Sequence, residues 1–160
     1  MSEYIKCPYH GINDHSCRMR HRGMDNCALI DSIEYSSLEL KPFFPEIIKI
    51  LKPKELWLSG DEIKRRAGKH NAHLGQWHAD YLSWVTDPEN RDTRNLQSHE
   101  KAIPEEWQKY NLFFPGTVWR NAEGHEYVPY LHFWYTWWLV EFRWLNTSWY
   151  PKDRFVRIRR

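Results

Sequence analysis

The chain has 160 residues, of which 16% are aromatic and 28% charged, and its formal net charge at pH 7 is +2. This length indicates one domain, with room for a small appended module. The nearly neutral charge gives no global electrostatic argument for nucleic-acid binding, and no apolar run is long enough for a membrane span.

The first 27 residues hold all three cysteines and a group of histidines. Structural zinc sites take four such ligands in a tetrahedron. His10 follows Cys7 after two residues, a spacing that lets both side chains converge on one ion. We therefore predict a structural zinc site formed by Cys7, His10, Cys17 and Cys27, with His21 as a substitute ligand. The alternative is that the cysteines are small buried apolar residues without a metal.

This cluster divides the chain into a loop-rich metal-binding module at residues 1–30 and an aromatic-rich α+β body at residues 31–160. The odd cysteine count argues against a closed disulfide framework, and the N-terminus lacks the apolar stretch of a signal peptide. We expect a cytoplasmic or other reducing intracellular location, with no membrane partner.

Proline and glycine residues indicate where the helices and strands begin and end in the first half of the body. Pro45 and Pro53 bracket a predicted helix over residues 45–52, with a short strand at 55–58. Ser59 and Glu62 form a capping box that opens an amphipathic helix over 59–86, with a break near Gly75. A polar loop follows over 86–102.

The second half of the body is aromatic and favours strands. A short helix is predicted over 104–112, and Pro115–Gly116 is a predicted turn. Strands at 117–120 and 127–133 flank a turn at 121–124. Residues 134–145 are ambiguous, because His132, Thr136, Leu139 and Arg143 recur at helical spacing, but strand propensity favours an antiparallel strand. The last predicted element is an edge strand over 155–160. The expected fold class is therefore α+β.

Local basic clusters and ten tryptophans indicate a surface for nucleic acid or a nucleoprotein. Cations bind phosphates, and aromatic rings can stack on bases. The alternative is solvated charge around an aromatic core. The predicted contact residues are Arg18, Arg20, Arg22, Arg65, Arg66, Arg157, Arg159 and Arg160.

Two other functions stay open at this stage. A metal-dependent nuclease or hydrolase could use His15, or the group His70, His73 and His78 on the predicted long helix. A protein-binding inhibitor or assembly subunit could use the aromatic C-terminal surface. The chain has no Walker loop, nucleophile elbow or HExxH motif, so we favour a non-enzymatic protein.

Overall fold

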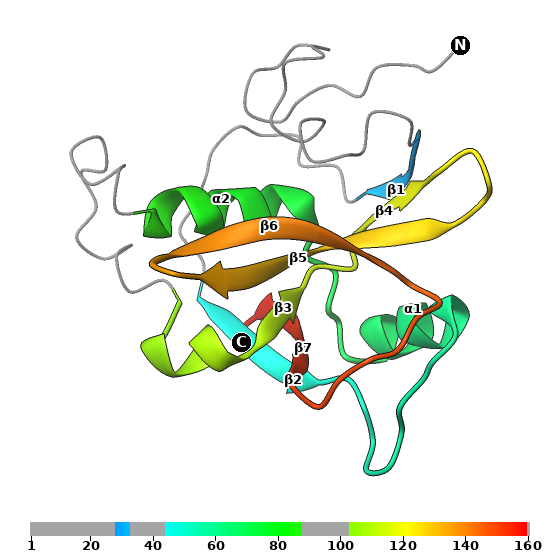
Figure 1. Ribbon diagram of the computed structural model, residues 1–160, viewed down its shortest axis with the longest axis horizontal. Coiled ribbons are helices and arrows are strands. Elements are labelled where there is room, and N and C mark those ends of the chain that lie inside the picture. Colours follow the sequence, from blue (N-terminus) through cyan, green and yellow to red (C-terminus); the bar gives the residue numbers. More distant parts are fainter. Residues whose placement is uncertain (1–27, 33–43, 88–102, 160) are drawn as a thin grey trace.

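The computed structural model describes residues 28–32, 44–87 and 103–159, which form a mixed α+β fold (Figure 1). None of the described helices is long and apolar enough to cross a membrane. The strands are β1 (Ala28–Ser32), β2 (Pro45–Lys49), β3 (Asn111–Phe113), β4 (Thr117–Arg120), β5 (Glu126–Trp134), β6 (Trp137–Trp144) and β7 (Asp153–Ile158), and the helices are α1 (Gly60–Lys69), α2 (Gln76–Thr86) and the short 3₁₀ helix η3 (Glu105–Lys109).

One seven-stranded sheet organises these elements, in the order β1-β4-β5-β3-β7-β2, with β6 paired to β5. Strand β6 pairs with β5 along almost its whole length, so β3 and β4 share the other edge of β5. The β3–β7 pair is parallel, and the other pairs are antiparallel. Because β1 begins at Ala28, it spans the predicted boundary at residue 30.

The two faces of the sheet carry separate cores. Successive side chains of a strand point to opposite faces. Leu112 packs into a core with Leu82 of α2 and Trp138, whereas Phe113 packs into a core with Ile63 of α1. All of these side chains are buried. Helix α2 therefore covers one face of the sheet and α1 the other, and Figure 1 shows α2 beside β5 and β6.

The predicted break near Gly75 is confirmed, because the single expected helix is two helices. The hydroxyl of Ser59 accepts a hydrogen bond from the Glu62 amide, which fixes the start of α1. Asn71 follows the helix with φ = 56°, a left-handed conformation that asparagine tolerates after a helix end. The second helix then begins at Gln76, whose amide donates to Thr117 Oγ1 over 2.9 Å.

The predicted helix over residues 45–52 is wrong, because this segment is strand β2. Its residues pair antiparallel with β7, including Ile47 with Val156 and Ile48 with Phe155. Those two isoleucines are β-branched and pack toward opposite cores, which suits a strand. Pro45 is accommodated because it is the first residue of a strand at the end of the sheet order.

The C-terminal strands follow the prediction with one correction. Strands occupy 117–120, 126–134 and 137–144, and the turns at 115–116 and near 122–123 are present. The expected helix before them is the shorter η3. The last strand is not at an edge, however, because β7 lies between β2 and β3. Its position in the sheet explains why Phe155 and Val156 are both completely buried.

Candidate functional site

The whole of the predicted zinc site lies outside the part of the chain that the structure describes. Within residues 28–32, 44–87 and 103–159, no group of three or more His, Cys, Asp or Glu side chains could hold a metal ion. The predicted residues outside the described ranges are Cys7, His10, His15, Cys17, Arg18, Arg20, His21, Arg22, Cys27 and Arg160.

The structure does not bring the second histidine group together on one helix. Helix α1 ends at Lys69, so His70 is its C-cap and exposed His73 lies in the connection to α2. His78 lies within α2, and its Nδ1 accepts a hydrogen bond from the Gly75 amide over 3.1 Å. Burial lowers the pKa of His78 to about 4, so its imidazole is neutral at pH 7. The predicted placement of these histidines on a single helix is therefore wrong.

Arg66 is buried and fully engaged with the protein. Its guanidinium donates to both carboxylate oxygens of Glu55 over 2.7 Å, to Glu62 over 2.8 Å and to the Ile50 carbonyl over 2.8 Å. Hydrogen bonding to Arg66 is the main cause that lowers the pKa of Glu55 to about 2. These contacts join the loop that follows β2 to helix α1, so Arg66 stabilises the fold.

The other predicted arginines that the structure describes differ in their exposure and in their hydrogen-bond partners. Arg65 is exposed but bound to Glu62. Arg157 donates to Glu46 over 2.8 Å and to the His70 carbonyl over 2.9 Å, so it joins β2 and the end of α1 to β7. Arg159 is exposed, and its amide donates to the Phe44 carbonyl. Arg159 is thus the described C-terminal arginine with the most accessible side chain.

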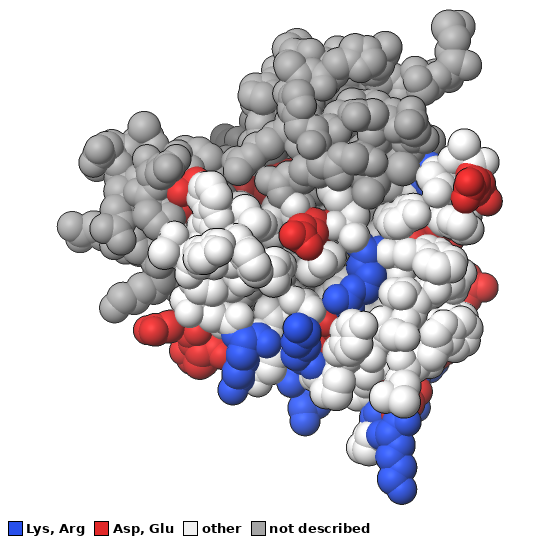
Figure 2. All heavy atoms as spheres, viewed as in Figure 1, with Lys and Arg blue, Asp and Glu red and all other residues white. Residues whose placement is uncertain are grey.

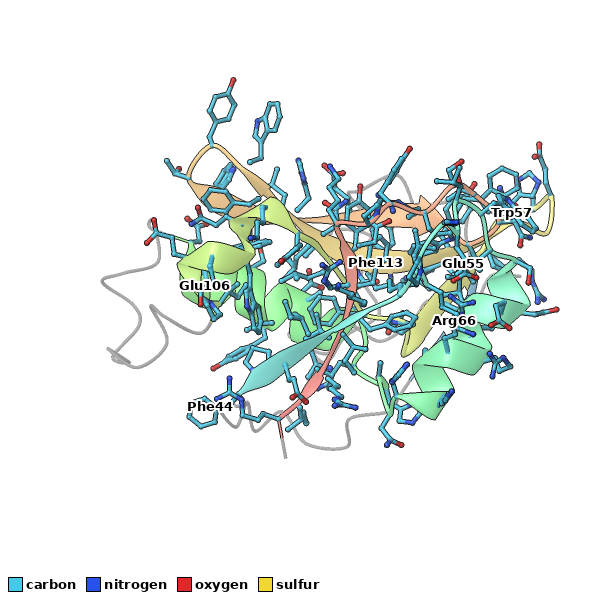
Figure 3. All side chains as sticks on the ribbon, turned by 90° about the horizontal axis from the view of Figure 1, so that it is seen from below. Phe44, Glu55, Trp57, Arg66, Glu106 and Phe113 are labelled. Carbon is cyan, nitrogen blue, oxygen red and sulfur yellow. The ribbon has the colours of Figure 1, made fainter. Side chains whose placement is uncertain are left out.

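An exposed apolar surface that the sequence analysis missed lies where two loops meet. Trp57 forms a bridge with Ser148, and the Trp149 amide donates to the Leu56 carbonyl over 3.1 Å. Leu56 is 72% exposed, Trp57 58% and Tyr150 48%. Figure 3 shows Glu55 beside Arg66, with Trp57 farther out at the edge of the molecule.

Lysines flank these apolar side chains on both loops. Lys52 and Lys54 precede Leu56, Lys152 follows Tyr150, and all three are exposed. The described part of the chain offers no ion pair to any of them. We name this set, composed of Lys52, Lys54, Leu56, Trp57, Tyr150 and Lys152, the Trp57–Tyr150 surface.

Nearby carboxylates do not cancel the positive charge of this surface. Glu55 is neutralised by Arg66, and Asp153 is completely buried against Arg143. Exposed Lys109 of η3 adds a further cation, 5.2 Å from the ring centroid of Tyr110, whose neighbour Asn111 donates its amide to the Lys152 carbonyl over 3.1 Å. Figure 2 shows several Lys and Arg side chains in the lower half of the view, with Asp and Glu side chains beside them at the left.

Arg143 holds Tyr150 in place from beneath. Its guanidinium carbon lies 5.3 Å from the ring centroid of Tyr150, and its Nη1 donates to Asp153 over 2.5 Å. Asp153 also accepts a hydrogen bond from the Tyr150 amide over 2.7 Å. The cation and the carboxylate therefore fix both the ring and the backbone of Tyr150, while about half of the side chain stays accessible.

A second exposed aromatic group lies at the tip of the β5–β6 hairpin. Trp134 is 50% exposed, Tyr135 82% and Trp137 36%. Residues 127–140 include no Lys, Arg, Asp or Glu. This tip therefore has the apolar character of the Trp57–Tyr150 surface without its lysines.

Two short sequence motifs could have indicated this surface. Lys-Pro-Lys-Glu-Leu-Trp at 52–57 and Tyr-Pro-Lys at 150–152 place cations beside aromatic residues. A surface with these side chains can bind an extended anion that carries flat apolar groups. No protein-family model, curated protein or solved structure matches the chain.

Proposed function

We propose that the protein is a non-enzymatic zinc-binding protein that contacts nucleic acid or a nucleoprotein, and that the Trp57–Tyr150 surface makes the contact. The observation that carries this proposal is the pairing of half-exposed aromatic rings with three exposed lysines that have no ion pair in the described part of the chain. Exposed lysines can neutralise phosphates and release counterions. The rings add stacking on bases.

Some of the predicted arginines support the fold in this proposal, and others remain contact residues for nucleic acid. Arg66 and Arg157 support the fold through Glu55 and Glu46, so we assign them no direct phosphate contact. Arg159 is exposed and remains a contact residue. Arg65 is 57% exposed but shares its charge with Glu62, so its expected contribution is smaller.

The salt dependence of binding tests the phosphate contacts. We expect the logarithm of the association constant for a mixed-sequence oligonucleotide to fall linearly with the logarithm of salt concentration. Each of Lys52→Gln, Lys54→Gln and Lys152→Gln should make the slope shallower by about 0.7–0.9. Fluorescence anisotropy at several salt concentrations measures the slope.

Arg120→Gln is the matched control for this titration. It also removes an exposed cation, but one that Glu126 already pairs, so the slope should stay within error of the parent protein. A salt-independent affinity, or equal changes for Arg120→Gln and the lysine variants, would overturn the proposed phosphate contact.

The proposed zinc module has its own test. Purified protein should contain about one zinc ion per chain, because three thiolates and one histidine close a tetrahedral site. Cys17→Ser should lower the zinc content to well below half an equivalent, whereas His15→Ala should leave it unchanged. Inductively coupled plasma mass spectrometry measures the stoichiometry. Protein purified without chelators and holding less than half an equivalent would contradict the zinc assignment.

A second candidate function is contact with a protein partner through the β5–β6 hairpin tip. The exposed Trp134, Tyr135 and Trp137 favour it, because tryptophan and tyrosine anchor many protein interfaces. The lack of charge along residues 127–140 makes the tip a poor site for phosphates. The hairpin therefore supplies an aromatic control for the nucleic-acid experiments.

A further inference from the structure

We infer that the Trp57–Tyr150 surface binds single-stranded nucleic acid in preference to a duplex, an inference that rests on the proposed function. It names the substrate class of that surface: an unpaired strand whose bases stack on Trp57 and Tyr150 while its phosphates meet Lys52, Lys54 and Lys152.

The exposed rings favour unpaired bases. A side chain can stack on a base only when that base is not already covered by its neighbours, and in a duplex both faces of each internal base are covered. Trp57 is 58% exposed and Tyr150 48%, so both rings can be reached from solvent. Stacking of this kind tolerates any base sequence, because every base has a flat aromatic face.

The described helices lack the features that read a duplex. Groove-reading proteins usually place a helix with basic or amide side chains into the major groove. Helix α2 contains no Lys or Arg, and α1 opens with Asp61 and Glu62. The exposed cation at its centre, Arg65, is bound to Glu62. Exposed Lys69 lies in the last turn of α1, and the three lysines of the Trp57–Tyr150 surface lie on loops rather than on a helix.

The two loops that carry the rings are fixed by contacts within the protein. The Trp57–Ser148 bridge fixes the first loop, and Arg66 anchors the adjacent Glu55. Arg143 and Asp153 fix Tyr150. A preordered surface loses little conformational entropy on binding. Lys54 lies three residues before Trp57, and Lys152 lies two residues after Tyr150, so each ring has a cation on its own loop.

The test compares one mixed-sequence strand of 12 nucleotides, as DNA and as RNA, with its own duplex. We expect the single strand to bind at least 10-fold more tightly than the duplex at the same salt concentration. Trp57→Ala and Tyr150→Ala should each weaken single-strand binding by roughly 5- to 150-fold, the equivalent of about 1–3 kcal/mol per stacked base. Fluorescence anisotropy measures the affinities, and circular dichroism checks the fold of each variant.

Two further variants separate stacking from general loss of apolar surface. Trp57→Phe keeps a ring and should retain most of the affinity. Trp134→Ala removes a tryptophan of similar exposure from the uncharged hairpin tip, and it should leave binding unchanged.

The outcomes distinguish this inference from the function on which it rests. Equal or tighter binding of the duplex, or unchanged single-strand affinity in both alanine variants, overturns the single-strand assignment and leaves nucleic-acid binding standing. Loss of affinity in Trp134→Ala equal to that in Trp57→Ala overturns the assigned surface. If neither the strands nor the duplex bind, the proposed function fails as well.

Discussion

Replacing Asp153 by alanine should lower the free energy of unfolding by about 3–5 kcal/mol, the cost of breaking a buried ion pair by removing one partner. The Asp153 side chain is completely buried, and Arg143 is only 14% exposed. The carboxylate also accepts hydrogen bonds from the Asn111 amide group over 2.9 Å and from the Tyr150 backbone over 2.7 Å. The variant leaves one buried cation and two donors without their acceptor.

Urea denaturation followed by tryptophan fluorescence measures this change. Glu141→Ala is the matched control, because Glu141 is an exposed carboxylate on the same strand as Arg143 and binds the Tyr130 hydroxyl. Its loss should cost less than about 1 kcal/mol, as is usual for exposed polar contacts. A loss below about 1 kcal/mol for Asp153→Ala would show that the pair contributes little to the fold.

A second outcome links this pair to binding. Asp153 and Arg143 both fix Tyr150, so Asp153→Ala should also weaken binding of a single strand, measured under conditions in which the variant is folded. Glu141→Ala should not. The stability and the recognition surface of this protein therefore depend on the same buried carboxylate.

Local signals in the sequence predicted the local structure well. The Ser59 hydroxyl caps α1, the break before Gln76 is present, and the strands from Thr117 to Trp144 lie within a few residues of their predicted bounds. Each of these features depends on residues close together in the chain. Helix caps and hairpin turns are therefore readable without knowledge of the fold.

Pairing between distant segments could not be predicted in the same way. Residues 45–49 begin with a proline and one acidic residue, as a helix start would, but Ile47 pairs with Val156 at the other end of the chain. The energy of that pairing and of burial in two cores outweighs the local preference. For the same reason the sequence did not reveal that β7 is an interior strand.

The residues of the Trp57–Tyr150 surface could not be predicted from the sequence. Arginines were predicted as the cations of the contact surface. Arg66, however, forms an ion pair with Glu55, eleven positions away in sequence. Ten tryptophans cannot be sorted into core and surface by composition alone. Trp119 is fully buried and Trp57 is 58% exposed because of where each lies relative to the sheet.

Gly75→Ala should destabilise the protein by about 2–4 kcal/mol, and Gly68→Ala should stabilise it slightly. A Cβ at residue 75 would lie 2.4 Å from Thr117 Oγ1, the same oxygen that accepts the Gln76 amide hydrogen bond over 2.9 Å. Thr117 is buried, so the added methyl group must displace it and disturb that bond. Overpacking costs about 1–3 kcal/mol, and an unpaired buried donor costs a similar amount.

Gly68 supplies the matched control, because it adds the same methyl group to the neighbouring helix. No atom lies within 4 Å of a Cβ at residue 68, and alanine in a helix restricts the unfolded chain, a gain of about 0.4–1 kcal/mol. Urea denaturation of both variants measures the difference. If Gly75→Ala were neutral, the close approach of the α2 start to Thr117 would not be a constraint on the fold. Opposite signs for the two variants would show that residue 75 is glycine because β4 leaves no room for a side chain, and that residue 68 is under no such restriction.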